Sequence, residues 1–158
     1  MNKSKRTHTR AFSLLELVIA VAIIAIIAAI GIPRLSRGTR GAADSALSGD
    51  LALLRNAVDI YAAEHLNTYP TEADITSQLT QYTDHQGSTS TTKTTTHIYG
   101  PYMRNIPPLP VGAKKGGTLI DVADGNDVGW IYDDADGSIK ANTTASEKDD
   151  AGKLYSDY

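Results

Sequence analysis

The sequence predicts an α+β fold in which one long N-terminal helix packs on a small antiparallel β-sheet of about three strands. Three observations carry this prediction: an apolar run near the N-terminus, a helical periodicity after it, and short β-rich segments near the C-terminus. The 158-residue chain has no cysteine. The fold must therefore rely on packing, or on a bound ion, in place of disulfides.

An apolar run extends from Leu14 to Ile32, and Glu16 is the only charged residue in it. As a helix, these 19 residues would be about 28 Å long, which is roughly the thickness of the hydrocarbon core of a bilayer. A carboxylate at the centre of a membrane helix costs about 2.5 to 3.5 kcal/mol, and less near an end. We therefore expect one membrane-spanning helix, with a partner that compensates the charge of Glu16.

The segment ahead of this run is basic. Residues 1–10 contain four lysines and arginines and no acid, a pattern that is typical of the start of a translocation signal and favours a cytoplasmic N-terminus. Arg34, Arg37 and Arg40 follow the run, so the charge asymmetry is only four against three. The orientation therefore needs support from another feature.

A short motif joins the basic segment to the apolar run. Residues 11–16 read Ala-Phe-Ser-Leu-Leu-Glu, and this motif resembles the prepilin-type processing site of type IV pilins and of the pseudopilins of type II secretion systems. The resemblance implies that a prepilin peptidase cuts between Ala11 and Phe12, and that the new N-terminus at Phe12 is then N-methylated. Ala11 departs from the glycine that is usual in the family, although alanine is also small.

Cleavage would give Glu16 a partner of opposite charge. The amine that it creates on Phe12 can meet the Glu16 carboxylate of a neighbouring copy when the helices pack side by side with an axial stagger. A subunit in the wrong register would leave a charge unpaired in a medium of low dielectric, so the pair would select the register of assembly. The alternative is that Glu16 reaches back to water at the lipid headgroups.

Past the apolar run, the sequence predicts an interruption and then an amphipathic helix. Gly31 and Pro33 predict a helix break, either as a kink or unwound stretch or as an ordinary helix end at the membrane surface. We expect the second helix to end near Asn67, because the following Tyr69-Pro70 does not easily continue it. Its core face repeats at spacings of four and three, at Leu47, Leu51, Leu54, Val58, Tyr61 and His65.

These features divide the chain into four parts. Residues 1–11 form a leader peptide, residues 12–33 the transmembrane and assembly helix, residues 34–46 a flexible continuation of the helix, and residues 47–158 a globular, pilin-like head. Loss of the leader removes four basic residues and no acid, so the net charge changes from −3 to −7. An acidic head disfavours nucleic acid as a partner.

The middle of the head combines a polar loop with a rigid segment. Residues 71–82 could form a short helix, whereas residues 83–97 are so rich in threonine and serine that they predict a mobile surface loop. Four prolines restrict the backbone of residues 100–110. Together with Tyr69-Pro70-Thr71 and residues 129–132, this segment resembles the head of the major pseudopilins.

Three short segments near the C-terminus predict the sheet. Residues 118–122, 128–132 and 138–141 are rich in β-branched and aromatic residues and are separated by Asp-Gly pairs, a pattern that favours an antiparallel meander. Trp130 is the only tryptophan and lies in the middle segment. It should pack against the helix.

Aspartates cluster at both turns of this sheet. Their oxygens suit calcium, which the resemblance to major pseudopilins also implies for this part of the head, although the spacing does not fit the twelve-residue calcium loop. The alternative is that these side chains cap the turns themselves. The calcium candidates are Asp121, Asp124, Asp127, Asp133, Asp134 and Asp136.

The sequence does not predict an enzyme. None of the four histidines, which are His8, His65, His85 and His97, lies in a recognisable nucleophile, zinc or phosphate motif. We expect His65 to be a partly buried packing residue of the helix. The sequence therefore favours a structural role.

The resemblance implies the structural subunit of a type II secretion pseudopilus, a periplasmic homo-oligomeric filament that drives protein secretion. The chain would cross the bacterial inner membrane once, with its head in the periplasm. Its partners would be the prepilin peptidase, the inner-membrane assembly platform, minor pseudopilins or pilins, and membrane lipid. Two alternatives remain: a type IV pilus subunit for adhesion, motility or DNA uptake, with its head in an extracellular filament, and a secreted binding domain with an ordinary signal peptide.

Overall fold

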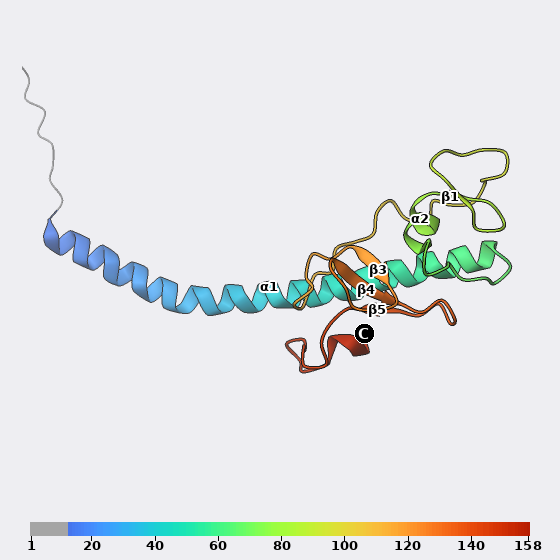
Figure 1. The fold of residues 1–158 in the computed structure, drawn as a ribbon. Coiled ribbons are helices and arrows are strands. Elements are labelled where there is room, and N and C mark those ends of the chain that lie inside the picture. Colours follow the sequence, from blue (N-terminus) through green and yellow to red (C-terminus); the bar gives the residue numbers. More distant parts are fainter. Residues whose placement is uncertain (1–12) are drawn as a thin grey trace, which may run out of the picture. The chain divides into compact units, whose positions relative to one another are not determined.

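The computed structural model describes residues 13–158, and for residues 31–37 it describes the backbone alone (Figure 1). The chain divides into two units, residues 1–38 and residues 39–158. The first unit contains the N-terminal part of the long helix α1, and the second contains the rest of α1 and all the other described helices and strands. This α+β, pilin-like architecture confirms the predicted fold class.

Helix α1 spans Leu14–Glu64. The helix continues through Gly31 and Pro33, so neither the unwound stretch nor the helix end that the sequence predicted there is found, whereas a kink stays a prediction. Residues 34–46 are helical, as expected for a continuation of the helix, and their flexibility also stays a prediction. A proline removes only one backbone hydrogen bond. The alanines, leucines and isoleucines on either side are good or acceptable helix formers, so the helix can continue through that loss.

The C-terminal end of α1 lies close to the predicted position. The helix ends at Glu64, and Leu66 and Asn67 then adopt left-handed backbone conformations, with φ of 55° and 62°. The Tyr69-Pro70 corner follows directly, and the carbonyl of Pro70 accepts a hydrogen bond of 2.9 Å from the hydroxyl of Tyr132. This bond fixes the corner to the sheet.

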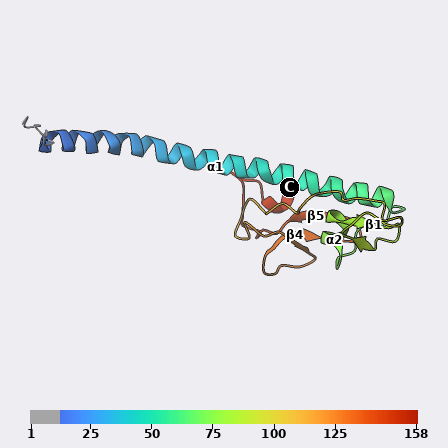
Figure 2. The ribbon, with the colours of Figure 1, turned by 90° about the horizontal axis from the view of Figure 1, so that it is seen from above.

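The core of the head forms along the predicted face of α1. Figure 2 shows α2, β4 and β5 along one side of the C-terminal half of the helix. Trp130 is fully buried in the same cluster of side chains, and its indole nitrogen donates a hydrogen bond of 2.8 Å to the carbonyl of Pro107. All six residues of the predicted face are buried, namely Leu47, Leu51, Leu54, Val58, Tyr61 and His65.

The main sheet has the three predicted strands, but one of them runs in the other direction. Strands β3 (Leu119–Asp121), β4 (Val128–Tyr132) and β5 (Ile139–Ala141) lie in that order. Strands β4 and β5 pair antiparallel, as predicted, whereas β3 pairs parallel with β4 and has an irregular register after Leu119. The antiparallel prediction for β3 is therefore wrong. Because β3 is so short, residues 122–127 are long enough to bring the chain back to the starting end of the strand.

The middle of the head contains one short helix and a small hairpin. Helix α2 spans Ile75–Thr80, inside the predicted range, and buries Ile75 and Leu79. Strands β1 (Tyr82–Thr83) and β2 (Thr89–Ser90) pair antiparallel, and all of their residues except Tyr82 lie in residues 83–97, which the sequence predicted to be a mobile surface loop.

The carboxylate of Asp84 organises this hairpin. Its Oδ1 atom accepts hydrogen bonds of 2.9 Å from the backbone N–H groups of Gln86 and Ser88. The side-chain amide of Gln78 donates a further bond of 3.0 Å to the carbonyl of Gly87. Composition alone does not reveal such bonds, because they depend on which backbone groups the folded chain brings together.

The C-terminal segment returns to α1. It contains a short 3₁₀ helix, η1 (Tyr155–Asp157), and the hydroxyl of Tyr155 donates a hydrogen bond of 2.8 Å to the carboxylate of Asp44. Burial, together with this bond, raises the pKa of Tyr155 to about 12. The last residues are thereby attached to the part of α1 with which the head begins.

Candidate processing and assembly segment

The predicted processing site lies at the start of the described chain. Ala11 and Phe12, the predicted cleavage and methylation residues, lie outside the described residues. The carbonyl of Ser13 accepts a hydrogen bond of 3.1 Å from the N–H of Leu17, and α1 begins at Leu14. The helix therefore starts within two residues of the predicted cut.

Glu16 lies in the first turn of α1 and is exposed to solvent in the single chain. The first N–H groups of a helix have no partner within the helix, and this end carries the positive pole of the helix dipole. Both effects favour a carboxylate at this position. The structure therefore gives the Glu16 carboxylate a local compensation at the helix N-terminus, and its partner on a neighbouring copy stays a prediction.

The side chains around Glu16 form an apolar surface on every side of the helix. Large apolar side chains between Leu14 and Ile30 are exposed by amounts from 51% at Ile19 to 80% at Leu14. They include consecutive residues such as Leu14 and Leu15, and Leu17 and Val18, so they do not follow a single stripe. A helix that is apolar all round is expected to be surrounded by lipid or by other protein.

Among the residues from 13 to 158 that the structure describes, no helix has both the length and the hydropathy needed to cross a membrane.

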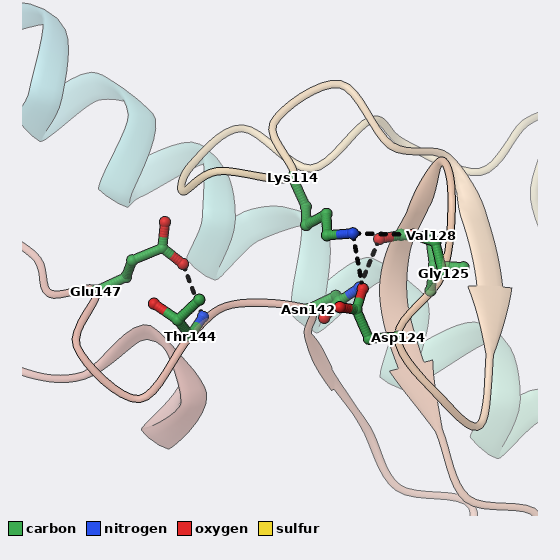
Figure 3. A network of polar contacts seen from close by, with 7 residues as sticks. All are labelled: Lys114, Asp124, Gly125, Val128, Asn142, Thr144 and Glu147. Carbon is green, nitrogen blue, oxygen red and sulfur yellow. Dashed lines mark hydrogen bonds and ion pairs between the residues drawn. The ribbon is translucent and has the colours of Figure 1, made fainter.

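One calcium candidate, Asp124, already has a cationic partner (Figure 3). The ammonium group of Lys114 lies 2.8 Å from the Asp124 carboxylate and also donates a hydrogen bond of 3.0 Å to the carbonyl of Gly125. The side-chain amide of Asn142 donates to the same carboxylate at 2.9 Å and to the carbonyl of Val128 at 2.8 Å. A lysine thus supplies positive charge at this turn. Sequence reasoning missed this network, because its members are far apart along the chain.

Three of the other candidate aspartates bind nearby backbone groups. The carboxylates of Asp133 and Asp136 accept hydrogen bonds from the N–H groups two residues later, at 3.0 and 2.8 Å, as expected for Asx turns. Asp121 accepts a bond of 2.7 Å from the N–H of Val122. No group of three or more metal-binding side chains occurs among the residues from 13 to 158 that the structure describes. Calcium binding stays a prediction.

The ion pair at Asp124 should make the stability of the head depend on pH. The hydrogen bond from Lys114, followed by that from Asn142, lowers the pKa of Asp124 from its ordinary value of 3.8. A lowered pKa in the folded state stabilises the head above pH 3.8, and this contribution disappears as the pH falls through the folded value. Wild type should therefore be more stable than Asp124→Asn near neutral pH, and the difference should shrink in acid.

Urea unfolding at several pH values, followed by tryptophan fluorescence, measures this difference. The matched control is Asp134→Asn, because Asp134 lies on the turn between β4 and β5 and forms no ion pair within the described residues. This variant should lack the acid-dependent difference. A constant gap between wild type and Asp124→Asn down to the lowest pH would contradict the role given to the ion pair.

Two parts of the structure together define a class of protein. A small α+β head is built on the C-terminal half of α1, and the N-terminal half presents an apolar surface with one carboxylate in its first turn. This is the architecture of a pilin-like subunit.

A comparison with protein families supports that class. The model of the prokaryotic N-terminal methylation motif matches residues 6–32. The motif indicates a membrane-anchored, type IV pilin-like protein that a prepilin peptidase processes, and it points to a structural subunit that assembles into a filament. Searches of curated proteins and of solved structures found no match.

Proposed function

We propose that the chain is a structural subunit of a type II secretion pseudopilus. It is inserted into the inner membrane through residues 12–33, cleaved between Ala11 and Phe12, methylated at Phe12 and assembled into a periplasmic filament. The observation that carries this proposal is the methylation motif over residues 6–32, most of which is a helix with exposed apolar side chains on all sides. Such a helix needs apolar neighbours. Lipid would surround it before assembly, and the helices of other copies would surround it in the filament.

The orientation of the chain follows from the processing motif. The leader stays in the cytoplasm in this proposal, and the acidic head lies in the periplasm. The motif is needed for this argument, because four basic residues precede the apolar run and three follow it. The assembly platform of the inner membrane and minor pseudopilins are the proposed partners of the assembling filament.

Intact mass spectrometry of the chain purified from cells tests the processing step. The expected mature chain begins at Phe12 and carries one added methyl group. Cells that lack the prepilin peptidase provide the control, and should yield the full precursor beginning at Met1. A mature chain that begins at Ile32 would instead indicate an ordinary signal peptide cut after Gly31, and would overturn the proposal.

A type IV pilus subunit is the second candidate, because the same motif and the same apolar helix serve both kinds of filament. The Tyr69-Pro70 corner, which Tyr132 fixes to β4 at 2.9 Å, supports the pseudopilus through the predicted resemblance of the head. Deletion of the gene that encodes this chain distinguishes the two candidate functions. Loss of secreted proteins with unchanged surface fibres supports the pseudopilus, whereas loss of long surface fibres that contain this chain supports the pilus.

A further inference from the structure

His65 joins the end of α1 to the hairpin. It follows Glu64, the last residue of the helix, and its side chain is buried, with 3% exposed. Its Nδ1 atom lies 2.8 Å from the backbone carbonyl oxygen of Tyr61, and its Nε2 atom lies 2.8 Å from the backbone carbonyl oxygen of Asp84. Both ring nitrogens therefore face hydrogen-bond acceptors.

The number of protons on the ring decides whether both contacts are hydrogen bonds. A neutral imidazole has one N–H donor and one acceptor nitrogen, whereas an imidazolium has two donors. The carbonyls of Tyr61 and Asp84 can only accept. In the neutral form, one of the two short contacts would place a nitrogen lone pair against a carbonyl oxygen, so only the protonated ring satisfies both.

The surroundings of the ring also suit a cation. His65 lies at the C-terminal end of α1, where the helix dipole and the last carbonyl groups favour positive charge. The ring of Tyr61 stacks on it with the centroids 3.8 Å apart and the planes at 6°, and the rings of Tyr99 and Tyr102 lie at 5.1 and 6.4 Å. The face of the stacked Tyr61 ring attracts a cation.

Three titratable groups near His65 have shifted pKa values. Burial, followed by the effects of nearby acids, raises the pKa of Tyr61, and burial and the bond to Glu64 raise that of Tyr102. Although burial opposes it, the N–H groups of Ser88 and Gln86 lower the pKa of Asp84, and His97 acts in the same direction. The acidic residues of this region are Asp84 and Glu64, which precedes His65 and accepts a hydrogen bond from the hydroxyl of Tyr102, and the ring of Tyr99 completes the surroundings.

We propose that His65 is a proton-operated latch, which as an imidazolium holds the hairpin segment of residues 83–99 on the end of α1. Loss of the proton removes one of the two hydrogen bonds and loosens the contact at Asp84. A groove of about 540 Å³ beside the latch is lined by Asp84, His85, Thr96, Ile98 and Tyr99, among others. Two of these residues contact His65, so the latch also controls the shape of this surface.

Two measurements on the full mature chain in detergent test the latch. Nitrogen-15 NMR of labelled histidine reports whether both ring nitrogens of His65 carry protons at about pH 5.5, where an unperturbed histidine is mostly protonated. Hydrogen exchange, corrected for its intrinsic dependence on pH, reports the opening of residues 83–99. Between about pH 5.5 and pH 8.5, this segment should lose about tenfold in protection, the effect expected for one charge-assisted hydrogen bond. Protection of β4 and β5 should stay constant.

Two variants distinguish the effect of protonating His65 from the effect of its packing in the core. His65→Gln keeps one donor but does not titrate, so protection of residues 83–99 should no longer depend on pH. His85→Gln removes an exposed histidine of the same segment and should behave as wild type. A singly protonated His65 ring at about pH 5.5, equal protection at both pH values, or the same pH dependence in His65→Gln would each overturn the proposal. If His65→Gln fails to fold, the protonation state of the His65 ring measured in wild type still decides whether the proposal holds.

Discussion

Replacing Gly129 by alanine should destabilise the head by about 3 kcal/mol or more, at the upper end of the cost of overpacking a core. A Cβ atom at this position in β4 would overlap the carbonyl oxygen of Gly117 and lie 2.7 Å from its carbonyl carbon. Both atoms belong to the backbone, so no side-chain rotation relieves the clash. The strand would have to move away from Gly117, and this would disturb the hydrogen bond of 2.9 Å from the N–H of Asn142 to the Gly129 carbonyl.

Trp130 makes this effect measurable. It is the only tryptophan, it is fully buried and it follows Gly129 in β4, so urea unfolding followed by its fluorescence reports on the head of the full chain. Gly125→Ala is the matched control, because a Cβ atom there would meet only the Val128 side chain, at 3.2 Å. It should cost much less than Gly129→Ala. Equal unfolding midpoints for Gly129→Ala and wild type would show that the two backbone segments are not held as close as the structure has them.

The elements that sequence reasoning predicted correctly are those that follow a local pattern. The apolar spacing from Leu47 to His65 predicted the buried face of α1, since a helix brings residues three and four apart onto one side. Trp130 and its strand were predicted in the same way, from branched and aromatic residues between turn signals. The Asx turns at Asp133 and Asp136 also need only neighbouring backbone groups, so their residue types indicated them.

The parts that were missed depend on contacts between distant residues. Whether β3 runs parallel or antiparallel to β4 is decided by how the chain returns over residues 122–127, and the hydrophobic pattern is the same for both directions. Lys114 meets Asp124 and Asn142 only after the chain has folded, so no spacing marks these residues as a group. The unwound stretch or helix end expected at Pro33 was wrong because proline is a strong local signal, and that signal outweighed the helix formers around it.

Glu16→Ala should leave cleavage and membrane insertion intact and abolish filament assembly. In the proposed processing, the peptidase acts on the bond between Ala11 and Phe12, which does not involve Glu16, and removing a carboxylate makes the apolar run easier to insert. In the filament, however, the variant would leave the amine of Phe12 without its partner among the helices. Leaving one charge of a buried pair unpaired costs about 3 to 5 kcal/mol, which corresponds to a loss of at least roughly 100-fold in the affinity between subunits.

Three readouts on the same cells distinguish this defect from a failure of an earlier step. Intact mass checks cleavage, membrane fractionation checks insertion, and cross-linking with electron microscopy of isolated fibres measures assembly. Glu16→Gln is the matched control for size, since it retains the length of the side chain and a hydrogen-bonding group without the charge. If charge pairing sets the register, Glu16→Gln should fail at assembly as Glu16→Ala does. Normal fibres from Glu16→Gln would show that a polar group without charge is sufficient at this position. Normal fibres from Glu16→Ala would contradict the pairing hypothesis altogether, and the helix N-terminus would then be the only compensation of the Glu16 carboxylate.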